Sequence, residues 1–202
     1  MNISFLRKLF KSHKNVSRES GAGFTIVELL VVIAVVTVLP MIAISNFPAI
    51  KLQFALSRVS HKFAQDIRRT QDKSLSSIEY KDSFGTVQLV DGYGIYLDMV
   101  TLGNKKYIIY ADKQPSNSQY DTLDYLFETI DFSLSERGVV IKEINNVFGS
   151  DVSINFNPPD SDTTITQLVQ DADSVEIVFA LESDANNTKT VSINKSGLVE
   201  VQ

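Results

Sequence analysis

The side chains that most often carry out chemistry in proteins are scarce in this sequence. It contains two histidines, His13 and His61, and no cysteine. Disulfides and thiolate metal sites are therefore excluded, and a Ser–His–Asp triad or a multi-histidine zinc site has almost no residues from which it could be built. The sequence predicts a protein that is not an enzyme and that needs no cofactor.

Three aspartates in the segment 111–124 raise one metal hypothesis, because calcium prefers oxygen ligands. They are Asp112, Asp121 and Asp124. When an EF-hand loop is counted from Asp112, its twelfth position falls on Leu123 instead of the required glutamate, so the pattern does not match. Acidic residues in a polar loop are ordinarily solvated, and we favour that interpretation over a calcium site.

One carboxylate is unusual because of its surroundings. Glu28 is the only ionisable side chain between residues 24 and 50, and a charge inside an apolar helix is costly unless it has a partner. The carboxylate could reach back to lipid headgroups. Alternatively, a cut between Gly23 and Phe24 would create an α-amino group one helical turn from Glu28, and that amine could pair with the carboxylate of an adjacent subunit.

The segment that carries Glu28 has the length of a membrane span. Residues 24–44 contain a single charge, and 21 residues at about 1.5 Å each extend over roughly 30 Å, the thickness of a bilayer core. A secretory signal peptide would have a shorter apolar core, of about 7–15 residues, followed by small residues at its cleavage site. A plain single-pass anchor is also compatible with this length.

Charge is distributed unevenly around the apolar run. Residues 1–23 hold five basic residues and one acidic residue, a net charge of +4, whereas residues 77–202 hold eight basic and twenty acidic residues, a net charge of −12. A basic start before an apolar span is typical of a cytoplasmic N-terminus, so we expect the distal part on the outer side of the cytoplasmic membrane. The acidic distal part also argues against binding to nucleic acid, whose phosphates attract Lys and Arg.

The residues around the expected cut resemble those of a known family. The sequence GFTIVELL at residues 23–30, between a basic leader and an apolar run, is similar to the class III signal of type IV pilins and pseudopilins. The resemblance implies that a prepilin peptidase removes the leader 1–23 by cutting after Gly23 and methylates Phe24. It also implies that Glu28 guides docking of the subunit into a growing filament. The leader is longer than in many family members.

Beyond Pro48 the pattern predicts that the helix continues and becomes amphipathic. Apolar residues recur there at steps of three or four, namely Leu52, Leu56, Val59, Phe63 and Ile67. Basic residues occupy much of the remaining surface, either as a solvated face or as partners of acidic groups on neighbouring subunits. Pro40 and Pro48 each remove a backbone hydrogen bond, so we expect a kink or local unwinding at both. One spine helix is thus predicted over residues 24–77.

After residue 77 the apolar period changes to that of strands. Residues 92–98 and 105–110 alternate on either side of a turn at 101–104, which predicts a hairpin. Further strands are expected at 127–134, 139–144, 152–156, 175–181, 190–193 and 198–201, with a hairpin loop at 185–188. We expect an α+β fold, in which the long N-terminal helix packs on one face of a mainly antiparallel sheet in a β-rich domain over 78–202.

Parts of the distal sequence resemble the GspH/FimT-like branch of minor pseudopilins; they are the segments 66–71, 93–96, 107–112 and 192–199. The function predicted from all these features is a structural subunit, a minor pilin or pseudopilin, of a type IV pilus-like or type II secretion-like filament. Its expected partners are the membrane, prepilin peptidase and other pilin subunits. The alternative is a membrane-tethered binding module that never polymerises, which would need neither Glu28 nor a glycine before Phe24.

Overall fold

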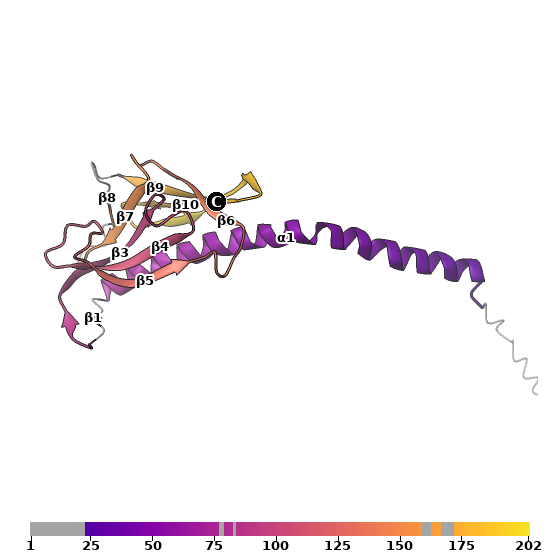
Figure 1. The fold of residues 1–202 in the computed structure, drawn as a ribbon, viewed down its shortest axis with the longest axis horizontal. Coiled ribbons are helices and arrows are strands. Elements are labelled where there is room, and N and C mark those ends of the chain that lie inside the picture. Colours follow the sequence, from indigo (N-terminus) through magenta and orange to yellow (C-terminus); the bar gives the residue numbers. More distant parts are fainter. Residues whose placement is uncertain (1–22, 77–78, 83, 159–162, 167–171) are drawn as a thin grey trace, which may run out of the picture. The chain divides into compact units, whose positions relative to one another are not determined.

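The computed structural model describes residues 23–76, 79–82, 84–158, 163–166 and 172–202, and the chain divides into two compact units, residues 1–45 and 46–202. Helix α1 (Ile26–Leu75) contributes to both units (Figure 1). Across the described residues, no single helix has the length and hydropathy expected of a membrane span. The pair Ile26–Ile42 and Phe47–Leu75 passes that test only when both are taken together.

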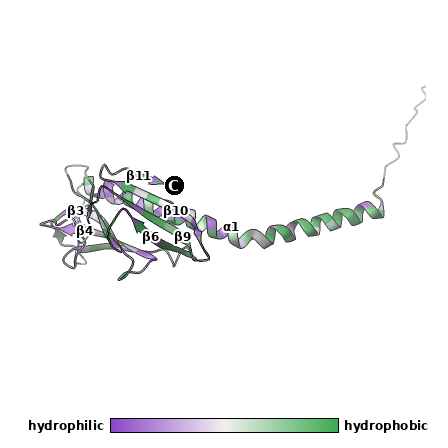
Figure 2. Cartoon of the chain, turned by 90° about the horizontal axis from the view of Figure 1, so that it is seen from above, coloured by the Kyte–Doolittle hydropathy of each residue, from purple (hydrophilic) through white to green (hydrophobic). Residues whose placement is uncertain are grey.

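The part of α1 in the first unit is apolar on all sides. Its large apolar side chains, from Phe24 to Ile44, are all at least 49 % exposed, and this stretch of the ribbon is coloured as hydrophobic almost throughout (Figure 2). The hydroxyl of Thr37 donates to the backbone oxygens of Ile33 and Ala34, so its polarity is satisfied within the helix. A helix that is apolar on all sides is ordinarily buried.

The second unit contains the remainder of α1 and eleven described strands. They are β1 (Tyr80–Lys81), β2 (Val87–Gln88), β3 (Val90–Asp98), β4 (Lys106–Lys113), β5 (Tyr125–Asp131), β6 (Val139–Asn145), β7 (Asp151–Phe156), β8 (Thr163–Thr166), β9 (Ser174–Leu181), β10 (Asp184–Asn194) and β11 (Val199–Val201). The sheets have the orders β5-β4-β3-β7-β8, β11-β10-β9-β6 and β1-β2. Every described strand pair is antiparallel, which confirms the α+β class.

Two details of the predicted sheet are wrong. The strands form two main sheets instead of one. The expected loop at 185–188 lies inside β10, which continues through an irregularity in its pairing with β9 between Asp184 and Thr188. Polar residues can be accommodated there because this end of β10 is largely exposed. The predicted hairpin is confirmed as the β3–β4 pair.

Both main sheets share one hydrophobic core with the amphipathic part of α1. The predicted apolar stripe is confirmed, since Leu56, Val59, Phe63 and Ile67 are all buried. The ring of Phe63 shows how the layers meet. Its centroid lies 5.0 Å from the ring of Tyr107 on β4 and 5.4 Å from that of Phe179 on β9. One helix residue therefore packs edge-on against aromatic rings from both sheets.

Part of the outer face of the five-stranded sheet is also covered. A Cβ atom at Gly94 on β3 would lie 2.5 Å from the ring of Tyr110 on the paired strand β4, so only glycine leaves room for that ring. Tyr120, from the loop after β4, packs on Tyr110 and Tyr96 with ring centroids 5.1 and 4.8 Å away. The exposed sheet face that the sequence predicts is therefore partly shielded by this loop.

Candidate functional site

The predicted cleavage residues precede the helix. Gly23 and Phe24 have no helical or strand assignment, and α1 begins at Ile26. A Cβ atom at Gly23 would meet nothing within 4 Å, so the described residues supply no steric reason for glycine there. Phe24 is 82 % exposed. The leader that a cut would remove lies outside the described residues, except for Gly23, and both cleavage and methylation stay predictions.

Thr25 caps the start of α1. Its hydroxyl oxygen accepts a 3.1 Å hydrogen bond from the backbone N–H of Glu28, and its carbonyl oxygen accepts one of 3.1 Å from the N–H of Leu29. Thr25 and Glu28 stand at the Ser/Thr-x-x-Glu spacing of a capping box. The sequence analysis missed this role, although the spacing in front of an apolar run is a recognised signal for it.

Glu28 lies in the first turn of α1, where the partial positive charge of the helix N-terminus favours a carboxylate. No ion pair formed by Glu28 is found among the described residues. The docking role of Glu28 stays a prediction. Pro40 and Pro48 stand on either side of the break between Ile42 and Phe47 at which α1 divides into two segments. The kinks at these prolines likewise stay predictions.

The basic residues of the amphipathic part of α1 have partners in their own chain. Arg58 donates two hydrogen bonds to the Glu136 carboxylate, at 2.5 and 2.7 Å. The guanidinium of Arg69 reaches Glu128 on β5 at 3.0 Å, and that of Arg68 donates to the carbonyl of Val199 at 3.0 Å. These contacts tie the helix to both main sheets. The side chains of Arg58 and Arg69 remain 60 and 49 % exposed, so they lie on a solvated face and also have partners within the chain. Pairing with acidic groups of neighbouring subunits stays a prediction.

A groove of about 530 Å³ runs beside this part of α1. Its walls are mainly apolar and come from the helix, from Tyr107 on β4 and from the turn that contains Phe132 and Glu136. Asp66 lies in its lining and is buried, and its Oδ2 atom accepts hydrogen bonds from the Tyr107 hydroxyl at 2.6 Å and from Lys62 at 2.9 Å. Sequence analysis could not find this groove, because its walls come from segments far apart in the chain.

The aspartates of the segment 111–124 serve as hydrogen-bond acceptors for nearby groups. Asp112 is buried, and its Oδ2 atom accepts from the Ser116 hydroxyl, the Ser118 N–H and the Asn155 amide. Asp124 accepts from the backbone N–H groups of Lys113 and Asp121. Across the described residues, no three His, Asp or Glu side chains gather in a way that could hold a metal ion.

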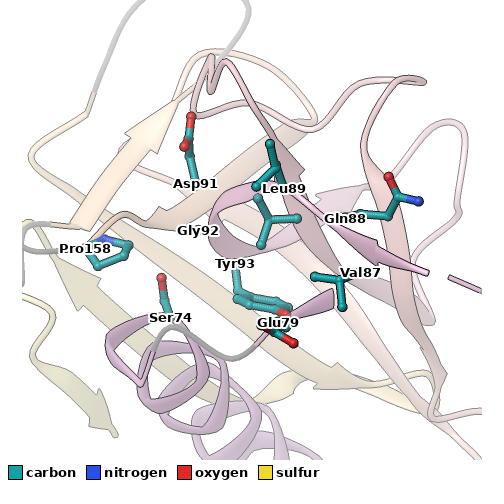
Figure 3. Close-up of a pocket in the computed structure, with 10 residues that line it drawn as sticks. Ser74, Glu79, Val87, Gln88, Leu89, Asp91, Gly92, Tyr93 and Pro158 are labelled. Atoms are coloured by element: carbon teal, nitrogen blue, oxygen red, sulfur yellow. The ribbon is translucent and has the colours of Figure 1, made fainter. Parts of the chain in front are cut away.

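A second, smaller cleft of about 180 Å³ lies where α1 ends and β3 begins (Figure 3). Tyr93 and Glu79 stand in its middle in this view, with Pro158 and Leu89 around them. Its lining mixes apolar, hydroxyl and carboxylate groups, and the Asp91 carboxylate accepts a 2.8 Å hydrogen bond from the Ser116 N–H. The described lining contains no histidine.

No family model and no curated protein matches this sequence. Among solved structures, the chain resembles the crystal structure of the type IV minor pilin FimU of Pseudomonas aeruginosa (strain PAO1). The TM-score is 0.43 with 8 % sequence identity, over 73 % of this chain and 87 % of that chain. A similarity at this level carries no argument about function, so the proposals below rest on the residues themselves.

Proposed function

We propose that this chain is a structural subunit, a minor pilin or pseudopilin, of a type IV pilus-like or type II secretion-like filament. The observation that supports this most is the first part of α1, an exposed helix that is apolar along most of its length. Its single acidic residue, Glu28, lies at its capped start. Such a surface gains free energy when it leaves water for lipid or for a bundle of similar helices. The acidic, β-rich second unit follows it in the chain.

Assembly begins with processing in the proposed mechanism. Prepilin peptidase cuts after Gly23, in the non-helical stretch before the Thr25 cap, and the new terminus at Phe24 is methylated. The amine of Phe24 then lies about one helical turn from Glu28 along the helix. In a bundle of such helices the amine of one subunit pairs with the carboxylate of another, and each charge offsets the desolvation of the other.

The proposed location follows from the charge pattern. The basic leader stays on the cytoplasmic side of the cytoplasmic membrane, the first part of α1 spans it, and the acidic second unit lies outside. The subunit passes from there into the filament. Within the family we propose the GspH/FimT-like branch, on the distal segments that resemble it. The net charge of −12 over residues 77–202 gives no support to nucleic acid as a partner.

The experiment that tests this proposal is N-terminal mass spectrometry of the protein from membranes, with and without the host's prepilin peptidase. The expected result is a terminal peptide that begins at N-methylated Phe24 and disappears when the peptidase is absent. An intact Met1 terminus in both samples would overturn the proposal. It would favour the alternative function, a membrane-tethered binding module that does not polymerise.

A further inference from the structure

We propose that Asn186 is an acceptor site for an N-linked oligosaccharide, added by a membrane-bound oligosaccharyltransferase. The inference goes beyond the proposed function and rests on it only for the location of the second unit outside the cytoplasmic membrane, where such enzymes act. Its support comes from the sequence around Asn186, from the irregular pairing of β10 at this point and from the contrast with a second asparagine, Asn194.

The residues around Asn186 form an acceptor pattern. N-linked glycosylation requires Asn-x-Ser/Thr, in which x is not proline, and Asn186-Asn187-Thr188 matches this pattern. Asp184 stands two residues before Asn186, and some oligosaccharyltransferases also require an acidic residue at that position. The segment 184–188 therefore satisfies both the short pattern and this longer, more restrictive one.

The middle of this segment bulges out of the sheet. β10 pairs Asp184 with Leu181 of β9 and then Thr188 with Ala180, so residues 185–187 are additional on the β10 side. The other neighbour of β10, β11, pairs only with residues 191–193 among the described ladder partners. A bulged stretch at the end of a strand can enter the extended peptide site of an enzyme with fewer ladder hydrogen bonds to break than a regular strand has.

The acceptor side chain is accessible. Asp184, Asn186 and Thr188 are all exposed, and the first buried residue of β10 is Val191. The backbone N–H of Asn186 donates a 3.1 Å hydrogen bond to the Asp184 carboxylate. Across the described part of the chain, no hydrogen bond holds the side-chain amide of Asn186. The segment can therefore open locally while the core stays closed.

Asn194-Lys195-Ser196 is the other match to the short pattern within residues 23–202, and its asparagine is held in place. The side-chain oxygen of Asn194 accepts hydrogen bonds from the backbone N–H groups of Ser196 and Leu198, at 3.0 and 3.1 Å. The residue two positions before it is Ser192, which is not acidic. The same short pattern thus occurs once in an accessible bulge and once in a tight turn, and the chain supplies its own control.

The proposed step is a substitution at the first sugar of the donor, a polyprenyl-diphosphate-linked oligosaccharide. The side-chain amide nitrogen of Asn186 attacks the anomeric carbon and forms a C–N bond, while the bond between that carbon and the diphosphate oxygen breaks. Polyprenyl diphosphate leaves with the bonding electron pair, and the amide nitrogen gives up one proton to a base of the transferase. The step needs neither an oxidant nor a reductant.

Co-expression of the full chain with an oligosaccharyltransferase that requires an acidic residue before the acceptor, together with its lipid-linked donor, tests the proposal. Mass spectrometry of tryptic peptides locates the glycan, because cleavage after Lys189 separates the two asparagines. The expected result is one glycan on the peptide that contains Asn186, lost when the transferase is absent and lost in Asn186→Gln. We expect Asn194→Gln to leave the modification unchanged.

Two further pairs of variants test the pattern itself. Thr188→Ala should abolish the modification, whereas Thr188→Ser, which keeps the hydroxyl, should retain it. Asp184→Asn should lower it at least tenfold, whereas Asp184→Glu should not. All four positions of change lie on the exposed end of β10, so the melting temperature should stay the same. A glycan that persists in Asn186→Gln, or one found on Asn194 at the same level, would overturn the inference.

A second assay separates this inference from the proposed function. The purified full chain in detergent is incubated with the same transferase and donor, so that the location of the second unit has no effect. Modification in detergent but not in cells supports the acceptor site and contradicts the proposed location. An unmodified Asn186 in both assays refutes the acceptor site alone, because cleavage before Phe24 is measured separately at the N-terminus.

Discussion

The hydroxyl of Tyr107 donates a 2.6 Å hydrogen bond to the carboxylate of Asp66 and so joins β4 to α1 at the edge of the core. Lys62 reaches the same carboxylate oxygen at 2.9 Å. Burial and the neighbouring Asp66 charge raise the pKa of the Tyr107 hydroxyl, which therefore stays protonated and keeps its role as donor. A buried carboxylate is stable only while its donors are present, so this contact fixes the helix against the sheet.

We expect Tyr107→Phe to lower the free energy of unfolding by about 1–3 kcal/mol, because one lone pair of Asp66 loses its partner in a buried place. Chemical denaturation of the full chain in detergent measures this. Tyr80→Phe is the control, since the exposed hydroxyl of Tyr80 makes a long 3.4 Å contact with the Leu126 carbonyl. If both substitutions lowered the free energy of unfolding equally, the hydrogen bond to Asp66 would contribute no more to stability than the contact of Tyr80.

The cap at Thr25 predicts a difference between two conservative substitutions. Thr25→Val removes the acceptor for the Glu28 N–H and should destabilise the start of the helix by about 1 kcal/mol, whereas Thr25→Ser keeps it. Hydrogen exchange at the backbone amides of Glu28 and Leu29 measures the opening. Faster exchange in Thr25→Val alone is expected, and equal protection in both variants would contradict the cap.

Glu28→Gln tests the docking carboxylate. The variant keeps the shape and the helix but cannot pair with the amine of a neighbouring Phe24, so we expect membrane insertion and cleavage to proceed while incorporation into the filament fails. Western blotting of membrane and filament fractions measures both steps. Glu200→Gln, at an exposed position on β11, serves as the control. Normal incorporation of Glu28→Gln would refute the docking role.

The buried Asp112 predicts a pH dependence of stability. Burial raises its pKa above the ordinary value of 3.8, so the folded state binds this proton more tightly than the unfolded state does. The resulting stabilisation is complete when the pH is below 3.8, the ordinary pKa, and it is lost as the pH rises through the folded-state pKa. Asp112→Asn should therefore flatten the decrease in stability above 3.8, although Asp124, whose pKa is also raised by burial, still contributes.

Asp131→Asn is the matched control for Asp112→Asn, because it should change the pH dependence of folding stability in the opposite direction. The Ser133 hydroxyl lowers the pKa of Asp131 below 3.8, so its contribution is present above that value and is lost as the pH falls through the folded-state pKa. Thermal melting of both variants across the acidic range distinguishes them. Identical pH profiles for the two variants would contradict the assignment to Asp112.

Local patterns in the sequence predicted the local structure well. The apolar steps through Phe63 placed the buried face of α1, and the alternation around residues 92–98 placed β3. Pairings between distant segments were not predictable in this way, because an alternating strand does not specify its neighbours. The pairing of β3 with β7 and that of β6 with β9 therefore emerged only in the structure, and with them the division into two sheets.

The candidate sites also differ in whether a short segment of sequence could predict them. Gly23, Phe24 and Glu28 stand within six residues and form a pattern that a single short segment displays. The groove has no such pattern, since it brings together α1, Tyr107 and Phe132. The strands β1, β2 and β8 were missed for a different reason. β1 and β2 have two residues each, which is too short for alternation to be recognised. β8 has the sequence TTIT, in which a single apolar residue gives no alternation.

The apolar surface of the first part of α1 also determines how such a molecule can travel. Moving one large apolar side chain from an apolar phase into water costs about 1.5–3 kcal/mol of free energy. Such side chains occupy most positions from Phe24 to Ile44. Transfer of this helix from an apolar phase into water is therefore strongly unfavourable, so we expect copies to pass directly from one apolar phase to another. If the chain is the filament subunit proposed above, the bilayer would act as a reservoir that supplies copies and takes them back, and the filament could be dismantled and rebuilt without new synthesis.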